Sequence, residues 1–173
     1  MDLGAGCVKF FGHHEHRIDA KNRLAIPAEI RNRWRSEEDG AAFFAIPWRE
    51  GVIRLYPERD FFERAKAAQS APTLTPNEDE AELQATLFGL SSRVEWDSVG
   101  RIRLAEEMMD LVGLGQDVVR VGCGDRLEVR DQAAWREARR ARLAELPGQM
   151  ARIEARRGEG STSRRESLEG SRE

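Results

Sequence analysis

The stretch RIDAKNRLAIPAEIR (residues 17–31) has a counterpart later in the chain, VEWDSVGRIRLAEEM (residues 94–108). In both, an aspartate stands four residues before an arginine, and alternating apolar residues then lead into a helix-like run. The two pairs are Asp19 with Arg23 and Asp97 with Arg101. The same order of features in both stretches predicts an internal duplication. Each copy is too small to bury a core alone, so we expect the two halves to pack against each other as a pseudo-dimer.

Local patterns predict the same elements in each half. In the first half, alternation at 17–19 and 24–26 predicts two short strands around a tight turn, where Asn22 tolerates a left-handed backbone. A helix begins at Pro27, SEEDG forms a loop, and the strands AAFFAIP and GVIRLYP precede the helix PERDFFERAKAAQ. SAPTLTPN is a linker, and EDEAELQATLFGL is a helix. The plan then repeats through the strands SRVEWD and RIRLA, the helix AEEMMDLVG, the strands DVVRVG and DRLEVR, and the helix DQAAWREARRARLAEL.

Bulk composition narrows the class of protein. At 173 residues, of which 40% are hydrophobic, the chain can form one large domain or two small ones with a core. No apolar run approaches the roughly 18 residues of a membrane span, and the start lacks the features of a signal peptide. Cys7 and Cys123 lie far apart in no metal-type spacing, which indicates two reduced thiols in a cytoplasmic protein.

The formal net charge is −3, but the charges are unevenly distributed. Residues 13–35 hold six basic and three acidic residues, whereas residues 61–100 hold three basic and seven acidic residues. Positive charge is therefore concentrated near the first copy of the repeat. Such a patch could serve DNA, RNA or an acidic protein, and charge alone does not choose among them.

These motifs together resemble the MraZ family, bacterial transcription regulators built from two AbrB-like (SpoVT-AbrB) half-domains. The resemblance covers roughly residues 9–140. It rests on EHRIDAKNRLAIPAEIR, GVIRLYPERDFF, LFGLSSRVEWDSVGRIRLA and DVVRVGCGDRLEVRDQAAW. It implies an α+β fold, mainly β with short helices, in which two tandem βαββ-type half-domains form a swapped-hairpin AbrB-like barrel. Asn22 departs from the family pattern, which usually has glycine there, as the second half does at Gly100.

The resemblance also implies a function. Family members assemble into rings, bind short direct repeats upstream of the division and cell-wall gene cluster, typically repress it, and lie on the nucleoid. For this chain it implies double-stranded DNA and further copies of itself as partners, a location in the cytoplasm and nucleoid, and no cofactor or membrane. The expected segments are a first half-domain (13–59), connecting helices and linker (60–86), a second half-domain (91–133), a C-terminal helix (134–157) and a disordered tail (158–173).

The Asp/Arg pairs have two interpretations, a structural role in the turn and a functional role in binding. In the structural one, the carboxylate holds the arginine and backbone amides across a tight turn. Recurrence in both halves favours this role for Asp19, Asp97 and Arg101, because the halves share a fold. Arg23 could serve both roles, since it could be oriented by Asp19 and still present donors outward.

The two turns differ in charge, and this difference bears on function. The first turn, residues 20–22, reads Ala-Lys-Asn, whereas the second, residues 98–100, reads Ser-Val-Gly and has no charge. A loop that approaches DNA needs cations for phosphates and planar donors for guanine edges. Only the first turn offers them. We therefore predict a DNA-contacting set of Arg17, Lys21, Asn22 and Arg23, in the loop that the family also uses.

Other candidate sites are weaker. His13, His14 and His16 cluster in HHEH without the spacing of a zinc protease, so we expect exposed strand residues or auxiliary DNA contacts rather than a metal site. No catalytic constellation or phosphate-binding loop is evident, so no enzyme is predicted. The alternative to a regulator is an antitoxin-like protein-interaction module. Antitoxins generally carry one half-domain, whereas this chain carries two.

Overall fold

The computed structural model describes the backbone of residues 9–68 and 77–169 and the side chains of residues 9–68 and 77–157. The chain divides into two compact units, Met1–Trp135 and Arg136–Glu173. The first unit holds both copies of the repeat, and the second consists of most of one long helix. The predicted linker at 70–77 lies almost entirely outside the described residues.

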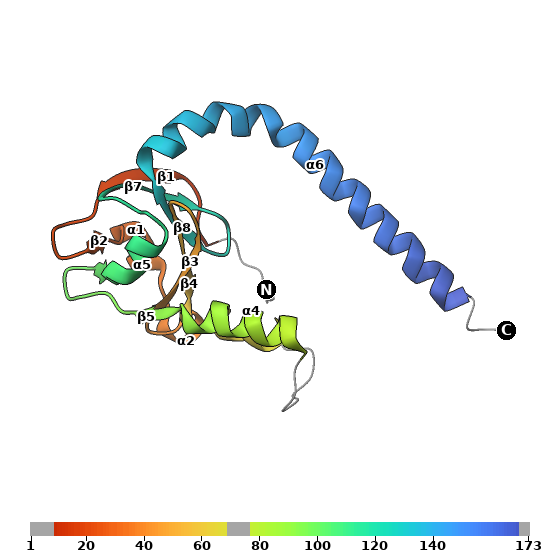
Figure 1. Cartoon of the computed structure of the whole chain (residues 1–173), viewed down its shortest axis with the longest axis horizontal. Coiled ribbons are helices and arrows are strands. Elements are labelled where there is room, and N and C mark those ends of the chain that lie inside the picture. The colour runs from red at the N-terminus through yellow and green to blue at the C-terminus, as the bar shows by residue number, and fades with distance from the viewer. Residues whose placement is uncertain (1–8, 69–76, 170–173) are drawn as a thin grey trace. The chain divides into compact units, whose positions relative to one another are not determined.

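Each half holds two strands, a short helix, two more strands and a final helix in that order, to which the first half adds α2 and the second half adds α4 (Figure 1). The first half contains β1 (His13–Arg17), β2 (Arg23–Ala25), α1 (Ala28–Arg33), α2 (Ser36–Asp39), β3 (Phe43–Arg49), β4 (Val52–Pro57) and α3 (Glu58–Ala68). The second contains α4 (Glu78–Gly89), β5 (Ser92–Val94), β6 (Arg101–Arg103), α5 (Glu106–Leu111), β7 (Asp117–Gly122), β8 (Leu127–Asp131) and α6 (Gln132–Glu169). The predicted α+β class is confirmed.

The strands form two antiparallel sheets that combine both halves. A six-stranded sheet has the order β1-β7-β8-β4-β3-β5, and a two-stranded sheet pairs β2 with β6. The halves exchange their first strands: β1 pairs with β7, and β5 pairs with β3. Interchanging equivalent strands of the two halves reproduces the same order in reverse. The sheet therefore has a pseudo-twofold axis between β4 and β8, which are neighbours.

One hydrophobic core is shared by the two halves. Leu24 and Ile102 lie opposite each other on β2 and β6, and both are fully buried. Phe43 of β3 is also fully buried and packs edge-on against Trp34 of the first half and Trp96 of the second, with ring centroids 4.7 and 5.9 Å away. Full burial of a side chain of this size stabilises the fold by about 1.5–3 kcal/mol. Neither half supplies this core alone.

Two predictions for the first half need correction. The strand predicted at 17–19 is β1, which spans His13–Arg17 and pairs with β7 of the second half instead of with β2. The stretch SEEDG, predicted as a loop, forms the short helix α2 at Ser36–Asp39. Asp39 closes that turn, because Oδ2 accepts from the Arg35 amide at 2.9 Å and its own amide donates to the Arg35 carbonyl at 2.7 Å. Oδ1 accepts from Lys9 Nζ at 2.5 Å. Local hydrogen bonds and a distant lysine thus stabilise a turn too short to show a helical pattern.

The helix α6 forms the second unit beyond Trp135. Its backbone runs to Glu169 and includes Pro147, whereas the sequence predicted a helix to 157 and a disordered tail. Side chains of residues 158–173 lie outside the described residues, and so does the backbone of 170–173, so the tail stays a prediction. Among the described helices, none combines the length and apolar character needed to span a membrane.

Candidate nucleic-acid interface

The first turn is held together by the carboxylate of Asp19. Its Oδ1 accepts hydrogen bonds from the backbone amides of Lys21 (2.9 Å) and Arg23 (3.0 Å). Its Oδ2 accepts from Nε and Nη2 of Arg23, each at 2.7 Å. Asn22 has a φ of 59°, the left-handed conformation predicted for this position. The aspartate therefore fixes both the turn and the direction of the arginine fork.

The second turn repeats this geometry with different residues. Asp97 Oδ1 accepts from the amides of Val99 and Arg101, both at 3.0 Å. Its Oδ2 accepts from Nε (2.9 Å) and Nη2 (2.8 Å) of Arg101. Gly100 takes the left-handed position, with a φ of 86°. The aspartate–arginine pair therefore has the same geometry in both halves.

The pKa values of both aspartates reflect these hydrogen bonds. For Asp97, the bond from the Arg101 amide, followed by that from the Arg101 side chain, lowers the pKa to about 2. For Asp19, desolvation opposes the shift, but the hydrogen bonds from Arg23 and Lys21 together lower the pKa below its usual range. Both carboxylates are therefore charged at neutral pH, and each faces an arginine.

Each turn also reaches across to the other half. The Ile26 amide donates to the Gly100 carbonyl (2.8 Å), and the Leu104 amide donates to the Asn22 carbonyl (2.9 Å). These two bonds flank the β2–β6 pair, which we call the ribbon. Hydrogen-bonded and non-hydrogen-bonded rows alternate along an antiparallel ladder. The row of Leu24 and Ile102 lies two residues from each of these bonds, so it is a hydrogen-bonded row. The turns and the ribbon thus form one continuous element built from both halves.

The predicted DNA-contacting residues occupy two different environments. Lys21 and Asn22 are in the first turn, where Lys21 is exposed and Asn22 is half-buried. Arg23 is at the start of β2, with 31% of its side chain exposed. Arg17 is the last residue of β1, and its guanidinium contacts Asp117 Oδ1 (3.2 Å) and Gln116 Oε1 (3.3 Å). The structure therefore groups Lys21, Asn22 and Arg23 and holds Arg17 against residues of the second half.

Sequence reasoning missed two arginines near the turns. Arg31 of α1 donates from Nε to the Ile26 carbonyl (3.2 Å) and lies so close to Gly100 that a Cβ there would be 2.5 Å from Nε. Arg103 ends β6, is exposed, and lies directly opposite Arg23. A signal for Arg103 was present, because the equivalent position in the first half is Ala25 and the copies differ there.

The histidines of HHEH contact different neighbours. The His13 ring lies 6.0 Å from that of Trp135, and His14 lines a cavity. His16 Nε2 is 2.8 Å from Nη2 of Arg120. Desolvation, then the charge of Arg120, and then His14 lower the pKa of His16, so this ring is neutral at pH 7. The three side chains are therefore not arranged around a common point.

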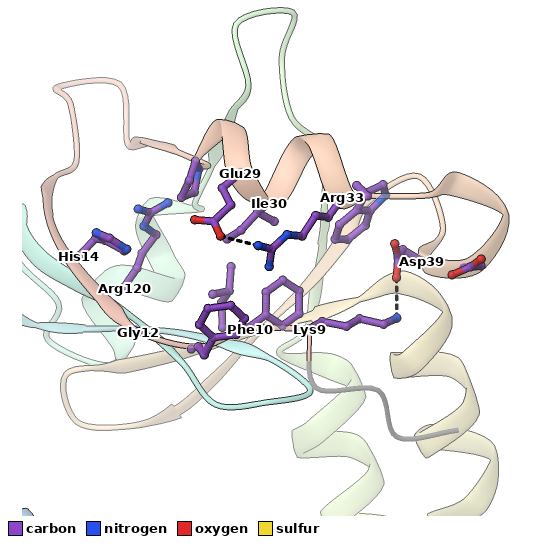
Figure 2. Close-up of a pocket in the computed structure, with 15 residues that line it drawn as sticks. Lys9, Phe10, Gly12, His14, Glu29, Ile30, Arg33, Asp39 and Arg120 are labelled. Atoms are coloured by element: carbon purple, nitrogen blue, oxygen red, sulfur yellow. Dashed lines mark hydrogen bonds and ion pairs between the residues drawn. The ribbon is translucent and has the colours of Figure 1, made fainter. Parts of the chain in front are cut away.

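The cavity beside β1 has a volume of about 240 Å³ and lies between α1, α2 and β7 (Figure 2). Arg120 and His14 are at one end, and the Lys9–Asp39 pair is at the other. Arg120 is 3% exposed, and burial lowers its pKa to about 10. It donates from Nη1 to the carbonyl of Ala25 at 3.0 Å. Arg120 therefore ties the end of β2 to the large sheet.

Cys123 takes no part in the contacts described above. Cys123 carries a free thiol, and burial, with a smaller contribution from Glu128, raises the pKa of that thiol. It is therefore protonated at neutral pH and unreactive as a nucleophile. Cys7 lies outside the described residues.

Comparison with known proteins identifies relatives over most of the chain. A family profile described as "MraZ protein, putative antitoxin-like" matches residues 87–151. The protein named Transcriptional regulator MraZ from Coxiella burnetii (strain RSA 493 / Nine Mile phase I) is 32% identical over 136 residues, which cover 79% of this chain and 88% of that protein. Proteins of the same name from Halorhodospira halophila and Nocardioides sp. are 29% and 30% identical over 148 residues, covering 82% and 83% of this chain and 96% and 97% of theirs.

Proposed function

The chain belongs to the MraZ family, and we propose on that basis that it is a sequence-specific transcription regulator that binds double-stranded DNA. The relatives are themselves named transcriptional regulators. It acts without a cofactor or catalysis, in the cytoplasm and on the nucleoid. It binds repeated sites upstream of the division and cell-wall gene cluster and represses its own promoter.

The observation that carries this proposal is the comparison of the two turns. Equivalent hydrogen bonds in the two turns agree in length to within 0.2 Å, so the hydrogen bonding does not distinguish one turn from the other. Only the first turn adds a lysine and an asparagine to that scaffold. Contact with DNA requires cations for phosphates and planar donors for base edges. Of the two matched turns, the first has the additional donors of this kind.

The DNA-contacting set in this proposal is Arg17, Lys21, Asn22 and Arg23. Arg23 has a fork oriented by Asp19, which suits two-donor recognition of guanine. Lys21 suits a phosphate, because its ammonium is a flexible point charge. Arg17 contributes from the end of β1, where its ion pair with Asp117 is 69% exposed on the arginine side and therefore easily exchanged for a phosphate.

The strand exchange supports a more specific architecture. Because β1 pairs with β7 and β5 pairs with β3, the proposed fold is a swapped-hairpin barrel of two AbrB-like half-domains, at 13–59 and 91–133. The halves are similar but unequal, so neighbouring subunits meet head to tail and close into a ring that presents several first turns to repeated sites. Light scattering on the full chain tests this assembly. A monomer mass at micromolar concentration overturns the ring.

A second candidate is an antitoxin-like module that neutralises another protein, since the matching family profile carries that word in its description. The two fused halves favour the regulator, because antitoxins generally pair one half-domain with an extended binding tail. A toxin gene beside this gene would favour the module.

Footprinting of the purified full chain on the DNA upstream of its own gene tests the proposal. We expect protection of several short repeated sites. No protection at micromolar protein, together with capture of a neighbouring gene's product, would replace the regulator with the module.

A further inference from the structure

The ribbon places one arginine from each half in the same row. Arg23 of β2 lies opposite Arg103 of β6, and the next row holds the fully buried Leu24 and Ile102. Because side chains alternate along a strand, the two arginines point away from the core. Theirs is a non-hydrogen-bonded row, where opposite side chains approach most closely.

This pairing puts like charges next to each other. Directly opposed like charges destabilise a sheet. The adjoining first turn adds Lys21, and Asp19 is the one acid in the turn and the row. The turn and the row therefore hold three cationic side chains and one carboxylate. That carboxylate, Asp19, is hydrogen-bonded to one of the three, Arg23. An anionic partner would offset this excess of positive charge.

The two arginines of the row differ in how they are held. Arg23 is oriented by hydrogen bonds from Nε and Nη2 to Asp19. Arg103 is exposed, and its side chain makes no hydrogen bond or ion pair with any described residue. A guanidinium without an orienting partner loses side-chain entropy when it is fixed in a two-donor geometry. Such a guanidinium can contact a phosphate oxygen with a smaller loss of entropy, because that contact depends more on charge than on orientation.

We infer that Arg103 of the second half contacts a DNA phosphate and completes, together with Lys21 and Arg23, a DNA-contacting surface that both halves share. This inference rests on the proposed DNA-binding function. It assigns different roles to the two members of the row: the oriented Arg23 reads base edges, and the unoriented Arg103 binds the backbone. Comparison of the two turns alone would leave the second half without any part in DNA contact.

The test uses the full chain and two duplexes of equal length, one selected by wild-type protein from a random library and one scrambled. Fluorescence anisotropy is measured over a range of salt concentrations for Arg103→Ala, Arg103→Lys and Arg23→Lys. Arg59→Ala is the matched control, because the Arg59 side chain is also exposed and makes no hydrogen bond or ion pair with any described residue, but lies on α3. Thermal melting and light scattering accompany each variant.

Arg103→Ala should weaken binding to both duplexes by the same factor, about fivefold to tenfold near 0.1 M salt, and should lower the salt slope by about 0.9 per engaged subunit. Arg103→Lys should retain most of the affinity, because the charge is kept. Arg23→Lys should lose binding to the selected duplex, because lysine lacks the planar fork. Arg103→Ala should melt at the same or a higher temperature than wild type, since a like-charge pair is removed.

Two results would overturn the inference and leave the proposed function intact. If Arg103→Ala binds both duplexes as tightly as Arg59→Ala does, Arg103 does not contact DNA. If it loses only the selected duplex and lysine does not restore binding, Arg103 reads bases and the phosphate assignment is wrong. A wild-type protein that selects no sequence would overturn the proposed function, and this inference with it.

Discussion

Replacing Arg23 with alanine and, separately, Arg101 with alanine compares two side chains in nearly identical environments. Both donate from Nε and Nη2 to their own aspartate, at 2.7 and 2.7 Å for Arg23 and at 2.9 and 2.8 Å for Arg101. Their exposed fractions are 31% and 30%. In both variants the aspartate keeps its two bonds to backbone amides. The structural cost is therefore equal, and a difference in DNA affinity reports the contact with DNA.

The expected magnitudes follow from this match. Because about a third of each arginine is exposed, either change should lower the melting temperature by only about 1–4 °C. A lost base contact costs about 1–3 kcal/mol, so Arg23→Ala should weaken operator binding by about 5- to 150-fold per site. A ring that engages several repeats should multiply that loss. Arg101→Ala should bind the operator like wild type when affinity is measured well below the melting temperature of the variant.

The assay is an anisotropy titration on the footprinted duplex, with thermal melting and light scattering for each variant. A folded, assembled Arg23→Ala protein that binds the operator as tightly as wild type would refute the reasoning. Equal losses of affinity in both variants at equal stability would also contradict it, because they would place a base contact on the second half.

Three further predictions concern stability. Deleting residues 158–173 should leave the melting temperature and the light-scattering mass unchanged, because this segment has few core-forming residues; aggregation of the shortened chain would show a structural role. The pKa of Asp97 is about 2 in the folded chain against an ordinary 3.8, so its ion pair stabilises the fold above about pH 4 and this contribution is lost as the pH falls to 2. The difference in melting temperature between wild type and Asp97→Asn should therefore shrink over that range, and a constant difference would contradict the assignment. Gly122→Ala puts a Cβ 2.2 Å from the backbone nitrogen of Phe11 and should lower the melting temperature, whereas Gly89→Ala, with nothing within 4 Å, should not; equal melting of the two would show that the segment at Phe11 moves aside.

Local patterns predicted most of the elements, for reasons that the structure makes clear. Alternation around Leu24 and Ile102 identified β2 and β6, because one face of each strand is fully buried. Asn22 was expected in a left-handed conformation and has a φ of 59°. In these cases the sequence pattern that predicts the structure lies within a few residues of the predicted strand or turn. The helix α2 was missed because four residues cannot display a helical period.

Strand partners are harder to predict, because they depend on residues far apart in the chain. Nothing local to His13–Arg17 indicates that β1 pairs with β7 rather than with its own half. The position of Arg103 opposite Arg23 follows from the register of β2 on β6, and register is set by packing of the whole core. Comparison of the two copies therefore identified the charge difference between the turns but missed an arginine beside the first turn.

The exchange of β1 and β5 between the halves has a consequence for synthesis on the ribosome. His16 of β1 and its hydrogen-bonded partner Arg120 of β7 are separated by 104 residues. At roughly 5–20 residues per second, translation delivers the second about 5–20 s after the first. During that interval the nascent first half has an unpaired strand and no complete core, so it depends on protection from aggregation. The basic row of the ribbon forms only after β6 has emerged, so a chain released early cannot act on DNA in the proposed way.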